Sequence, residues 1–193
     1  MRVFAALELP PGVREEIVGA FSKARSLAPK AKWVAAEAMH LTLHFFGEIP
    51  ETEIGGFSPV FDDPAVRGPA IRAALGAAGC FHGGGPPRVL WVGLAKGAEE
   101  MRAFWDLLTK RLEALRGNGG PLRSWSPDSR GFSPHITVAR AGAVPLSRHW
   151  AEEAVVPAAE FLIERCVLFQ SILGPAGPRY VPLKTILFQG GAV

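Results

Sequence analysis

The alternation of hydrophobic and polar positions predicts short strands interleaved with a few helices. Residues 2–9 alternate with the period of a strand, and residues 11–28 repeat apolar side chains at helical spacing behind Pro11. The strongest helical pattern covers residues 99–115, where apolar side chains form one stripe. Further strands are predicted at residues 33–34, 41–46, 70–75, 88–94, 161–171 and 180–188, and weaker helical patterns at 51–61 and 147–156. This order of elements predicts an α+β fold with mainly antiparallel sheet.

A four-residue pattern, His-x-Thr followed by a hydrophobic residue, occurs twice in the chain, about half a chain apart. The first copy starts with His40 and Thr42, and the second starts with His135 and Thr137. Each copy lies in an apolar run that predicts a strand, in which positions i and i+2 share a face and stand about 6.5 to 7 Å apart. The imidazole and the hydroxyl of each copy should therefore project together, with the intervening residue turned toward a core.

The repetition of this pattern suggests a site for acid–base chemistry on a phosphate ester. A single copy is typical of an ordinary polar strand face, whereas an internally duplicated α+β fold would bring two such strands together across a groove. One neutral imidazole could then accept a proton from water while one imidazolium donates a proton to a leaving oxygen. The two threonine hydroxyls could donate hydrogen bonds to the non-bridging phosphate oxygens.

Composition is compatible with this hypothesis but does not establish it. The 193 residues, 48% of them hydrophobic, suffice for one domain or two closely joined lobes. No stretch reaches the roughly 18 to 20 apolar residues that span a bilayer, and the start of the chain reads as a strand rather than a signal peptide. We therefore expect a cytoplasmic protein with no membrane partner. The net charge of +3 and the excess of arginine over lysine suit an anionic ligand, although genomic base composition explains the arginine bias equally well.

The two cysteines, Cys80 and Cys166, are too few and too far apart for a disulfide framework or a paired zinc site. Both are expected to be buried thiols. The sequence therefore predicts no metal site and no cofactor.

Segments along nearly the whole chain resemble one known family. They are residues 2–10, Trp33, residues 40–47, 88–93, 130–140, 168–171 and 177–180. In this order they resemble the two-histidine phosphoesterase superfamily, and within it the bacterial and archaeal RNA 2′,3′-cyclic phosphodiesterases once named 2′-5′ RNA ligases. A tetrapeptide alone is weakly specific, whereas the ordered set is strongly specific.

The resemblance implies a fold and an activity. The implied fold is bilobal, with two mainly antiparallel sheets related by pseudo-twofold symmetry, helices on the outer faces and a central cleft, in one domain over residues 1–193. The implied reaction is metal-independent opening of a terminal 2′,3′-cyclic phosphate of RNA to a 2′-phosphate, and the older name adds reversible 2′-5′ ligation. His40 then resembles the general acid, His135 the general base, and Thr42 and Thr137 the ligands of the phosphate oxygens. From the residues alone, either imidazole could take either role.

Two arginines flank the second copy of the motif. Arg130 lies in the irregular segment 117–134, which we expect to form an active-site loop, and it is a candidate for substrate binding. Arg140 ends the predicted strand with a parity opposite to that of His135 and Thr137. It would contact a ligand only if the strand twists or bulges there.

Aromatic residues near the motifs are candidates for stacking on a base. Phe45 and Trp33 are the tentative choices, although either could belong to the core. His44 has the parity of His40 and is expected at the rim of the site rather than as a third catalytic group.

The expected partners are RNA with 2′,3′-cyclic phosphate ends or small cyclic nucleotides, acted on by a monomer. Two alternatives remain open at this point. One is a non-catalytic RNA-end or nucleotide-binding module in which the histidines only bind phosphate. The other is a metal-dependent hydrolase, for which no motif supplies the usual ligand spacing.

Overall fold

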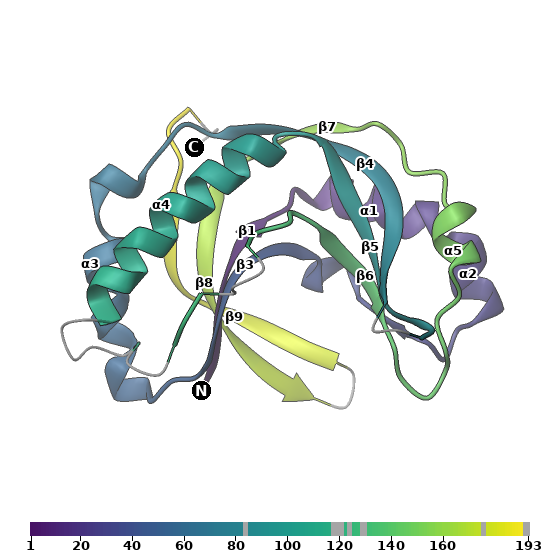
Figure 1. Ribbon diagram of the computed structural model, residues 1–193, viewed down its shortest axis with the longest axis horizontal. Coiled ribbons are helices and arrows are strands. Elements are labelled where there is room, and N and C mark those ends of the chain that lie inside the picture. Colours follow the sequence, from purple (N-terminus) through teal and green to yellow (C-terminus); the bar gives the residue numbers. More distant parts are fainter. Residues whose placement is uncertain (83–84, 117–121, 123–124, 128–130, 175–176, 191–193) are drawn as a thin grey trace.

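Nine strands form one sheet in the part of the chain that the structure describes (Figure 1). The computed structural model describes residues 1–82, 85–116, 122, 125–127, 131–174 and 177–190. The strands are β1 (Arg2–Glu8), β2 (Lys32–Trp33), β3 (His40–Glu48), β4 (Ile71–His82), β5 (Pro87–Lys96), β6 (Ile136–Arg140), β7 (Glu160–Ile163), β8 (Arg165–Gly174) and β9 (Gly177–Leu187).

The strand order is β7-β4-β5-β6-β3-β1-β8-β9, with β2 beside β6, and every one of these pairings is antiparallel. The predicted α+β class with mainly antiparallel sheet is confirmed. The expectation of two sheets is corrected, because Leu41 of β3 pairs with Ile136 of β6 and joins the strands into one path. This junction lies inside both copies of the His-x-Thr motif.

Five α-helices flank the sheet among the described residues. They are α1 (Pro11–Ala20), α2 (Ser22–Leu27), α3 (Ser58–Phe61), α4 (Ala98–Arg116) and α5 (His149–Glu152), with 3₁₀ turns at Ala36–Ala38, Glu51–Phe57 and Pro64–Val66. Helices α3 and α4 lie at one end of the molecule, and α1, α2 and α5 lie at the other (Figure 1). No helix of the described ranges is long and apolar enough to cross a membrane.

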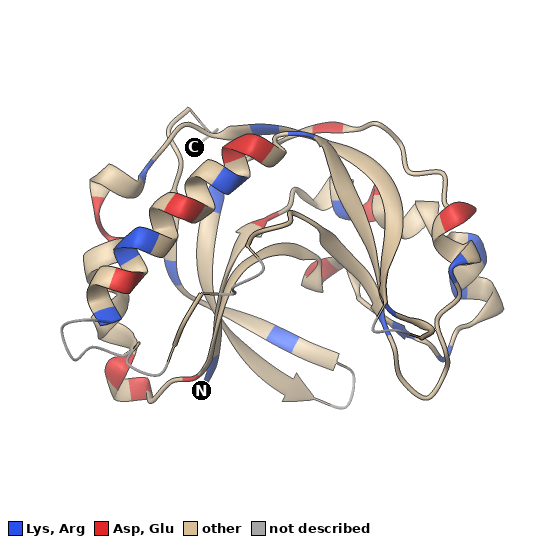
Figure 2. Cartoon of the chain, in the orientation of Figure 1, with Lys and Arg blue, Asp and Glu red and all other residues tan. Residues whose placement is uncertain are grey.

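The helix predicted over 11–28 is interrupted at Phe21, whose backbone leaves helical geometry (φ −105°, ψ 13°) and whose side chain is buried. Helix α4 matches its prediction: Met101, Leu108 and Leu112 are fully buried on one face. Acidic and basic residues follow one another along the rest of α4, as expected for a solvated face (Figure 2).

Strand β4 continues seven residues beyond its predicted end at position 75, because its glycines are needed for packing rather than for a turn. A Cβ atom at Gly79 would lie 2.4 Å from the indole of Trp91 on β5, and one at Gly76 would lie 2.8 Å from the backbone of Leu94. Glycine is therefore required where β4 and β5 approach closely. Of the two cysteines, Cys166 is buried as expected, but Cys80 on β4 is only partly buried.

Each of the two motif strands carries a β-bulge directly after its His-x-Thr. On β3, Ala6 of β1 pairs with Thr42 and Ala5 pairs with His44, so Leu43 is the extra residue. On β6, the neighbouring strand skips Val138 in the same way. A bulge reverses the alternation of the side chains that follow it. The residues directly beyond each of these bulges therefore face opposite to what strict alternation predicts.

His44 is the first residue affected, and its predicted rim position is wrong. The imidazole is 3% exposed, stacks on Trp105 of α4 at 5.2 Å between ring centroids, and lies with Nε2 3.1 Å from Oγ1 of Thr109. Burial lowers the pKa of His44 to about 4. The imidazole is therefore a neutral core group that ties β3 to α4.

This buried imidazole should make the stability depend on pH. The unfolded chain binds a proton at His44 near pH 6.5, whereas the folded chain binds it only near pH 4, so stability present above pH 6.5 is lost as pH falls. Between pH 7.5 and pH 5, the contribution of His44 to the free energy of unfolding should fall by about 2 kcal/mol. Urea unfolding at both pH values should show this much less pH dependence in His44→Gln than in the wild type. The control Arg102→Ala, which removes an exposed side chain of α4 and no histidine, should match the wild type, and an unchanged pH dependence in His44→Gln would contradict the assignment.

Candidate active site

The junction of β3 and β6 places both copies of the motif on one face of the sheet. Leu41 and Ile136 pair directly and are both fully buried, so their neighbours point to the other face. Antiparallel register then sets His40 across from Thr137 and Thr42 across from His135. The two histidines occupy diagonal positions, for which Cα atoms are separated by roughly 7 to 8 Å.

The His40 ring is held on both nitrogens. Its Nδ1 lies 2.8 Å from the carbonyl oxygen of Ala38, and its Nε2 lies 2.9 Å from Oγ1 of Thr42. Because a carbonyl oxygen only accepts hydrogen bonds, Nδ1 carries a proton and donates a hydrogen bond to the carbonyl oxygen of Ala38. In the neutral ring, the Thr42 hydroxyl then donates to Nε2. Phe4 and the edge-on ring of Tyr180 pack against the imidazole, at 4.9 Å and 5.2 Å between centroids.

The His135 ring is held in a matching way. Its Nδ1 lies 2.8 Å from the carbonyl oxygen of Ser133, so this nitrogen also carries a proton. Phe81 of β4 stands perpendicular to the ring at 4.9 Å between centroids. Both histidines therefore bond the backbone two residues earlier and direct Nε2 toward the site face.

The surroundings of the two imidazoles favour their neutral forms. Burial lowers the pKa of His40 to about 4, helped by the charges of Arg140 and Arg14, while the bond to Ala38 opposes the shift. Burial also lowers the pKa of His135, again opposed by its carbonyl partner and reinforced by Arg140. In the unliganded protein at neutral pH, both rings are therefore bases, and an anionic ligand would favour adding a proton.

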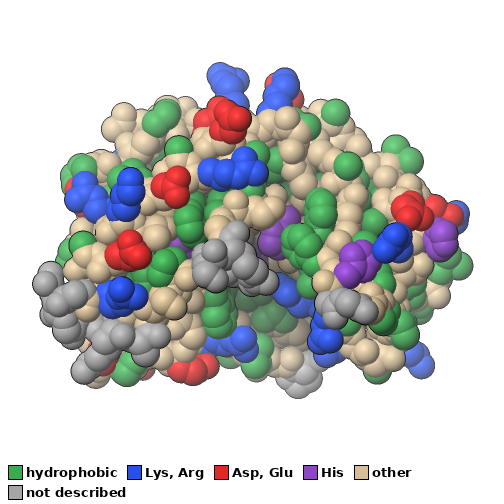
Figure 3. Space-filling view, viewed as in Figure 1, with side chains coloured by type: hydrophobic (Ala, Val, Ile, Leu, Met, Phe, Trp, Pro, Cys, Tyr) green, Lys and Arg blue, Asp and Glu red, His purple; other side chains and the backbone are tan. Residues whose placement is uncertain are grey.

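Two cavities adjoin the motif face. One of about 480 Å³, the His40-side cavity, is lined by His40 with residues of β1, α1, β8 and β9. The other, of about 820 Å³, is the His135-side cavity, which includes Thr42 as well as His135. Figure 3 shows a hollow in the middle of the viewed face, bordered by histidine, basic and hydrophobic side chains. The paired motifs thus stand between two spaces rather than inside one.

The bulges bring Phe45 and Arg140 to this face, although alternation predicts the opposite. Each residue lies five positions after the histidine of its motif, and each lines the His135-side cavity. The Phe45 ring is 49% exposed and carries the guanidinium of Arg2 at 4.9 Å from its centroid. The condition for ligand contact by Arg140, a bulge in its strand, is met.

Arg130 and Trp33, the other two candidates for substrate binding, have different outcomes. Arg130 lies outside the described residues. Trp33 lines neither cavity, because its indole packs against Trp150 and Phe21 and donates its N–H to the carbonyl of Ala28 at 2.9 Å. We correct its interpretation from base stacking to packing between β2, α1 and α5.

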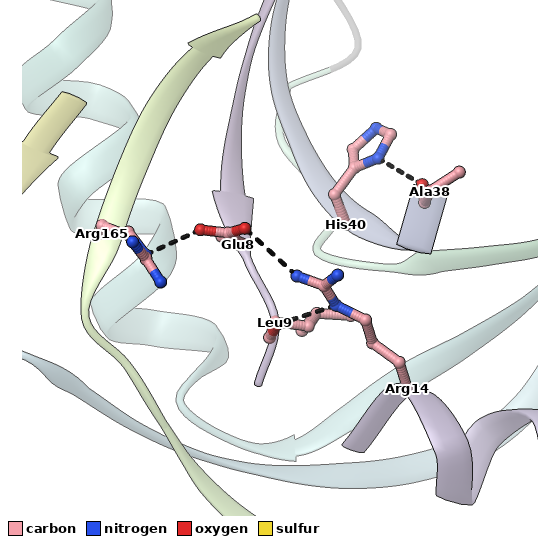
Figure 4. Close-up of polar contacts among 6 residues, drawn as sticks. All are labelled: Glu8, Leu9, Arg14, Ala38, His40 and Arg165. Atoms are coloured by element: carbon pink, nitrogen blue, oxygen red, sulfur yellow. Dashed lines mark hydrogen bonds and ion pairs between the residues drawn. The ribbon is translucent and has the colours of Figure 1, made fainter. Parts of the chain in front are cut away.

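Several cavity residues were not recognised from the sequence. Tyr180, the single tyrosine of the chain, contacts His40, and Arg14 and Arg165 both bind Glu8 on the wall of the His40-side cavity (Figure 4). A signal for Tyr180 existed, since it belongs to the segment 177–180 that resembles the family. Nothing local marks the arginines, because α1 and β8 meet β1 only in the folded chain. Among the described residues, no group of three or more His, Cys, Asp or Glu could hold a metal ion.

Comparison with known proteins identifies relatives of this chain. The family model described as LigT like Phosphoesterase matches residues 7–91. The RNA 2′,3′-cyclic phosphodiesterase of Thermotoga maritima is 31% identical over 197 residues, which cover 100% of this chain and 98% of the relative. The protein of the same name from Thermus thermophilus is 33% identical over 192 residues, which cover 98% of this chain and 91% of the relative. The crystal structure of TT0787 of Thermus thermophilus superposes with a TM-score of 0.76 at 31% identity, over the full length of both chains.

Arg140 should contribute to the low pKa values of both histidines, of which burial is the main cause. Its positive charge lowers the pKa of His40 and of His135, so Arg140→Ala should raise both. NMR titration of the imidazole C–H signals measures this directly. Arg102→Ala, which removes an exposed arginine of α4, should leave both values in place. Unchanged histidine pKa values in Arg140→Ala would show that the bulge does not direct this side chain toward the site.

Proposed function

Because the chain belongs to the LigT-like phosphoesterases, we propose that it hydrolyses 2′,3′-cyclic phosphate ends of RNA to 2′-phosphomonoesters without a metal ion. Its relatives named RNA 2′,3′-cyclic phosphodiesterase support this activity. The observation that carries the proposal is the β3–β6 junction, since it presents two imidazoles and two threonine hydroxyls on one face. Small 2′,3′-cyclic nucleotides are included as substrates, because the reacting group is the same.

In the proposed reaction, water attacks phosphorus and gives a proton to Nε2 of His135. The bond between phosphorus and O3′ breaks, and His40 donates its proton to O3′, which leaves a 3′-hydroxyl and a 2′-phosphate. Thr42 and Thr137 donate hydrogen bonds to the non-bridging oxygens, and Arg140 offsets the negative charge that develops there. The assignment of acid and base follows the family resemblance.

The low pKa of the half-buried His40 suits the acid role in one respect. A low pKa makes its imidazolium a strong acid toward the alkoxide that leaves, although the ring needs the substrate's negative charge to hold a proton first. Within the described part of the chain, the His135 ring forms its hydrogen bond through Nδ1 and leaves Nε2 unbonded. This nitrogen can therefore accept the proton of water. The two rings thus divide the proton transfers between them.

We place this activity in a monomer in the cytoplasm. Both cysteines are free thiols, as a reducing compartment would keep them. The older family name suggests reverse ligation of 2′-5′ bonds, which uses the same atoms with an RNA hydroxyl in place of water.

Replacing either histidine should nearly abolish turnover. One proton transfer contributes about 10²- to 10⁴-fold, so His40→Ala and His135→Ala should each lower the hydrolysis of a 2′,3′-cyclic mononucleotide by that factor. The assay contains excess chelator and identifies the product by phosphorus NMR, with a 2′-phosphate expected. His149→Ala, which alters an exposed histidine on α5, is the matched control. Wild-type turnover in either site variant would refute the pairing, and loss of wild-type activity in chelator would refute metal independence.

The pH dependence of kcat/KM should have its maximum on the acidic side. Productive free enzyme carries one proton on the pair, and both histidine pKa values lie below 6.5, with His40 near 4. Above about pH 6.5 the free pair has lost this proton, and kcat/KM should fall by up to tenfold per pH unit. The apparent pKa values belong to the coupled pair rather than to either ring. Steady-state assays of a cyclic mononucleotide from pH 5 to pH 9 measure the profile, and a rate that rises through this range would contradict it.

A further inference from the structure

The side chain of Trp105 lies outside both His-x-Thr motifs and contacts a residue next to each of them. It comes from helix α4, whose buried stripe belongs to the hydrophobic core. The indole is half-buried and lines the His135-side cavity. It forms a hydrogen bond on the side of the first motif and a ring stack on the side of the second.

The hydrogen bond holds the β-bulge that follows Thr42. Leu43 is the extra residue of this bulge, which the pairing with β1 passes over. Its carbonyl oxygen accepts a hydrogen bond from Nε1 of Trp105 at 3.1 Å. The preceding residue, Thr42, has its hydroxyl 2.9 Å from Nε2 of His40. The indole therefore fixes the backbone directly behind a hydroxyl that bonds one of the two site imidazoles.

The ring stack holds the segment that leads into the second motif. Residues 131–135 form an irregular segment before β6. Phe132 in this segment stacks on the indole, with 5.9 Å between ring centroids and 7° between the ring planes. The next residue, Ser133, supplies the carbonyl oxygen that accepts from Nδ1 of His135 at 2.8 Å. Because this carbonyl belongs to an irregular segment, its position depends on where Phe132 is held.

The indole is itself supported from the core. The buried imidazole of His44 stacks on it at 5.2 Å between centroids, with 23° between the planes. Trp105 therefore lies between a core ring and the ring of Phe132. A side chain packed in this way on a long helix is a firm support for groups at the site.

We propose that Trp105 is a positioning residue of the proposed reaction, which aligns Thr42 and His135 on the shared face of the sheet. The proposal rests on the proposed function, because it uses the roles given to these groups there. His135 accepts a proton through Nε2, so its other proton must stay on Nδ1. The stack on Phe132 keeps the acceptor of that proton in place. A misplacement of about 1 Å in such a group can lower a rate about 10²-fold.

Replacement of the indole tests this role in turnover. Trp105→Leu removes both contacts and should lower kcat for a 2′,3′-cyclic mononucleotide about 10- to 100-fold, with little change in KM. Trp105→Phe keeps a ring for the stack and should recover part of this loss. The matched control is Trp33→Leu, because Trp33 is also half-buried and donates its N–H to a backbone carbonyl, yet lines neither cavity. This control should turn over like the wild type.

A spectroscopic readout tests the positioning independently of turnover. Long-range ¹H–¹⁵N NMR at pH 8, where both rings are neutral, shows which imidazole nitrogen carries the proton. His135 should be in the Nδ1–H form in the wild type and in Trp33→Leu. Trp105→Leu should shift it toward the Nε2–H form. Phe132→Leu should do the same while leaving the indole in place, so it keeps the test decisive if Trp105→Leu does not fold.

The outcomes separate positioning from binding and from the reaction. Wild-type kcat in Trp105→Leu, or an equal loss in Trp33→Leu, would overturn the proposal. A higher KM at unchanged kcat would also overturn it, since Trp105 would then be a substrate contact. An unchanged Nδ1–H form of His135 in Phe132→Leu would overturn it as well. A wild type that turns over no cyclic phosphate would refute the proposed function, and the NMR comparison would still decide whether Trp105 orients His135.

Discussion

The pairing of Leu41 with Ile136 is the contact on which the site depends. It joins the two groups of strands at the motifs, and its burial turns four polar side chains to the opposite face. Because the contact is apolar and central in the sheet, the position of each imidazole is set by the core rather than by a loop. A one-residue slip of β3 against β6 would exchange the buried and exposed faces and remove the site.

The same geometry places the histidines where they are hard to protonate. Neither ring has a carboxylate hydrogen-bonded to Nδ1, and both feel the charge of Arg140. In the proposed mechanism, the bound phosphate is the negative group that would favour an imidazolium, so substrate binding and proton binding would support each other. A protein whose acid and base were charged before binding would lack this coupling.

The sequence predicts the site up to the bulges and fails beyond them. Period-two alternation correctly orients His40 through Leu43 and His135 through Val138, and helical periodicity correctly gives the buried stripe of α4. It misplaces His44, because the extra residue that reverses alternation is visible only in the pairing with β1. Strand β4 likewise continues past its predicted end at position 75, where Gly76 and Gly79 permit close packing on β5. The cluster of Glu8, Arg14 and Arg165 joins the consecutive elements β1 and α1 to the distant strand β8, and no shared local pattern marks the three residues.

Both imidazoles take their orientation from a carbonyl oxygen two residues upstream, at Ala38 and Ser133. A main-chain acceptor is present whatever amino acid occupies the position, so point substitution cannot delete it. Only a change in the path of the backbone, such as one imposed by a proline, would remove this acceptor. Substitution of Ala38 or Ser133 therefore leaves the acceptor for each Nδ1 proton in place, unlike in enzymes whose histidine relies on an aspartate side chain. Such an arrangement can recur as a short segment that begins two residues before the His-x-Thr motif, and in this chain it occurs at the start of both strands of the junction.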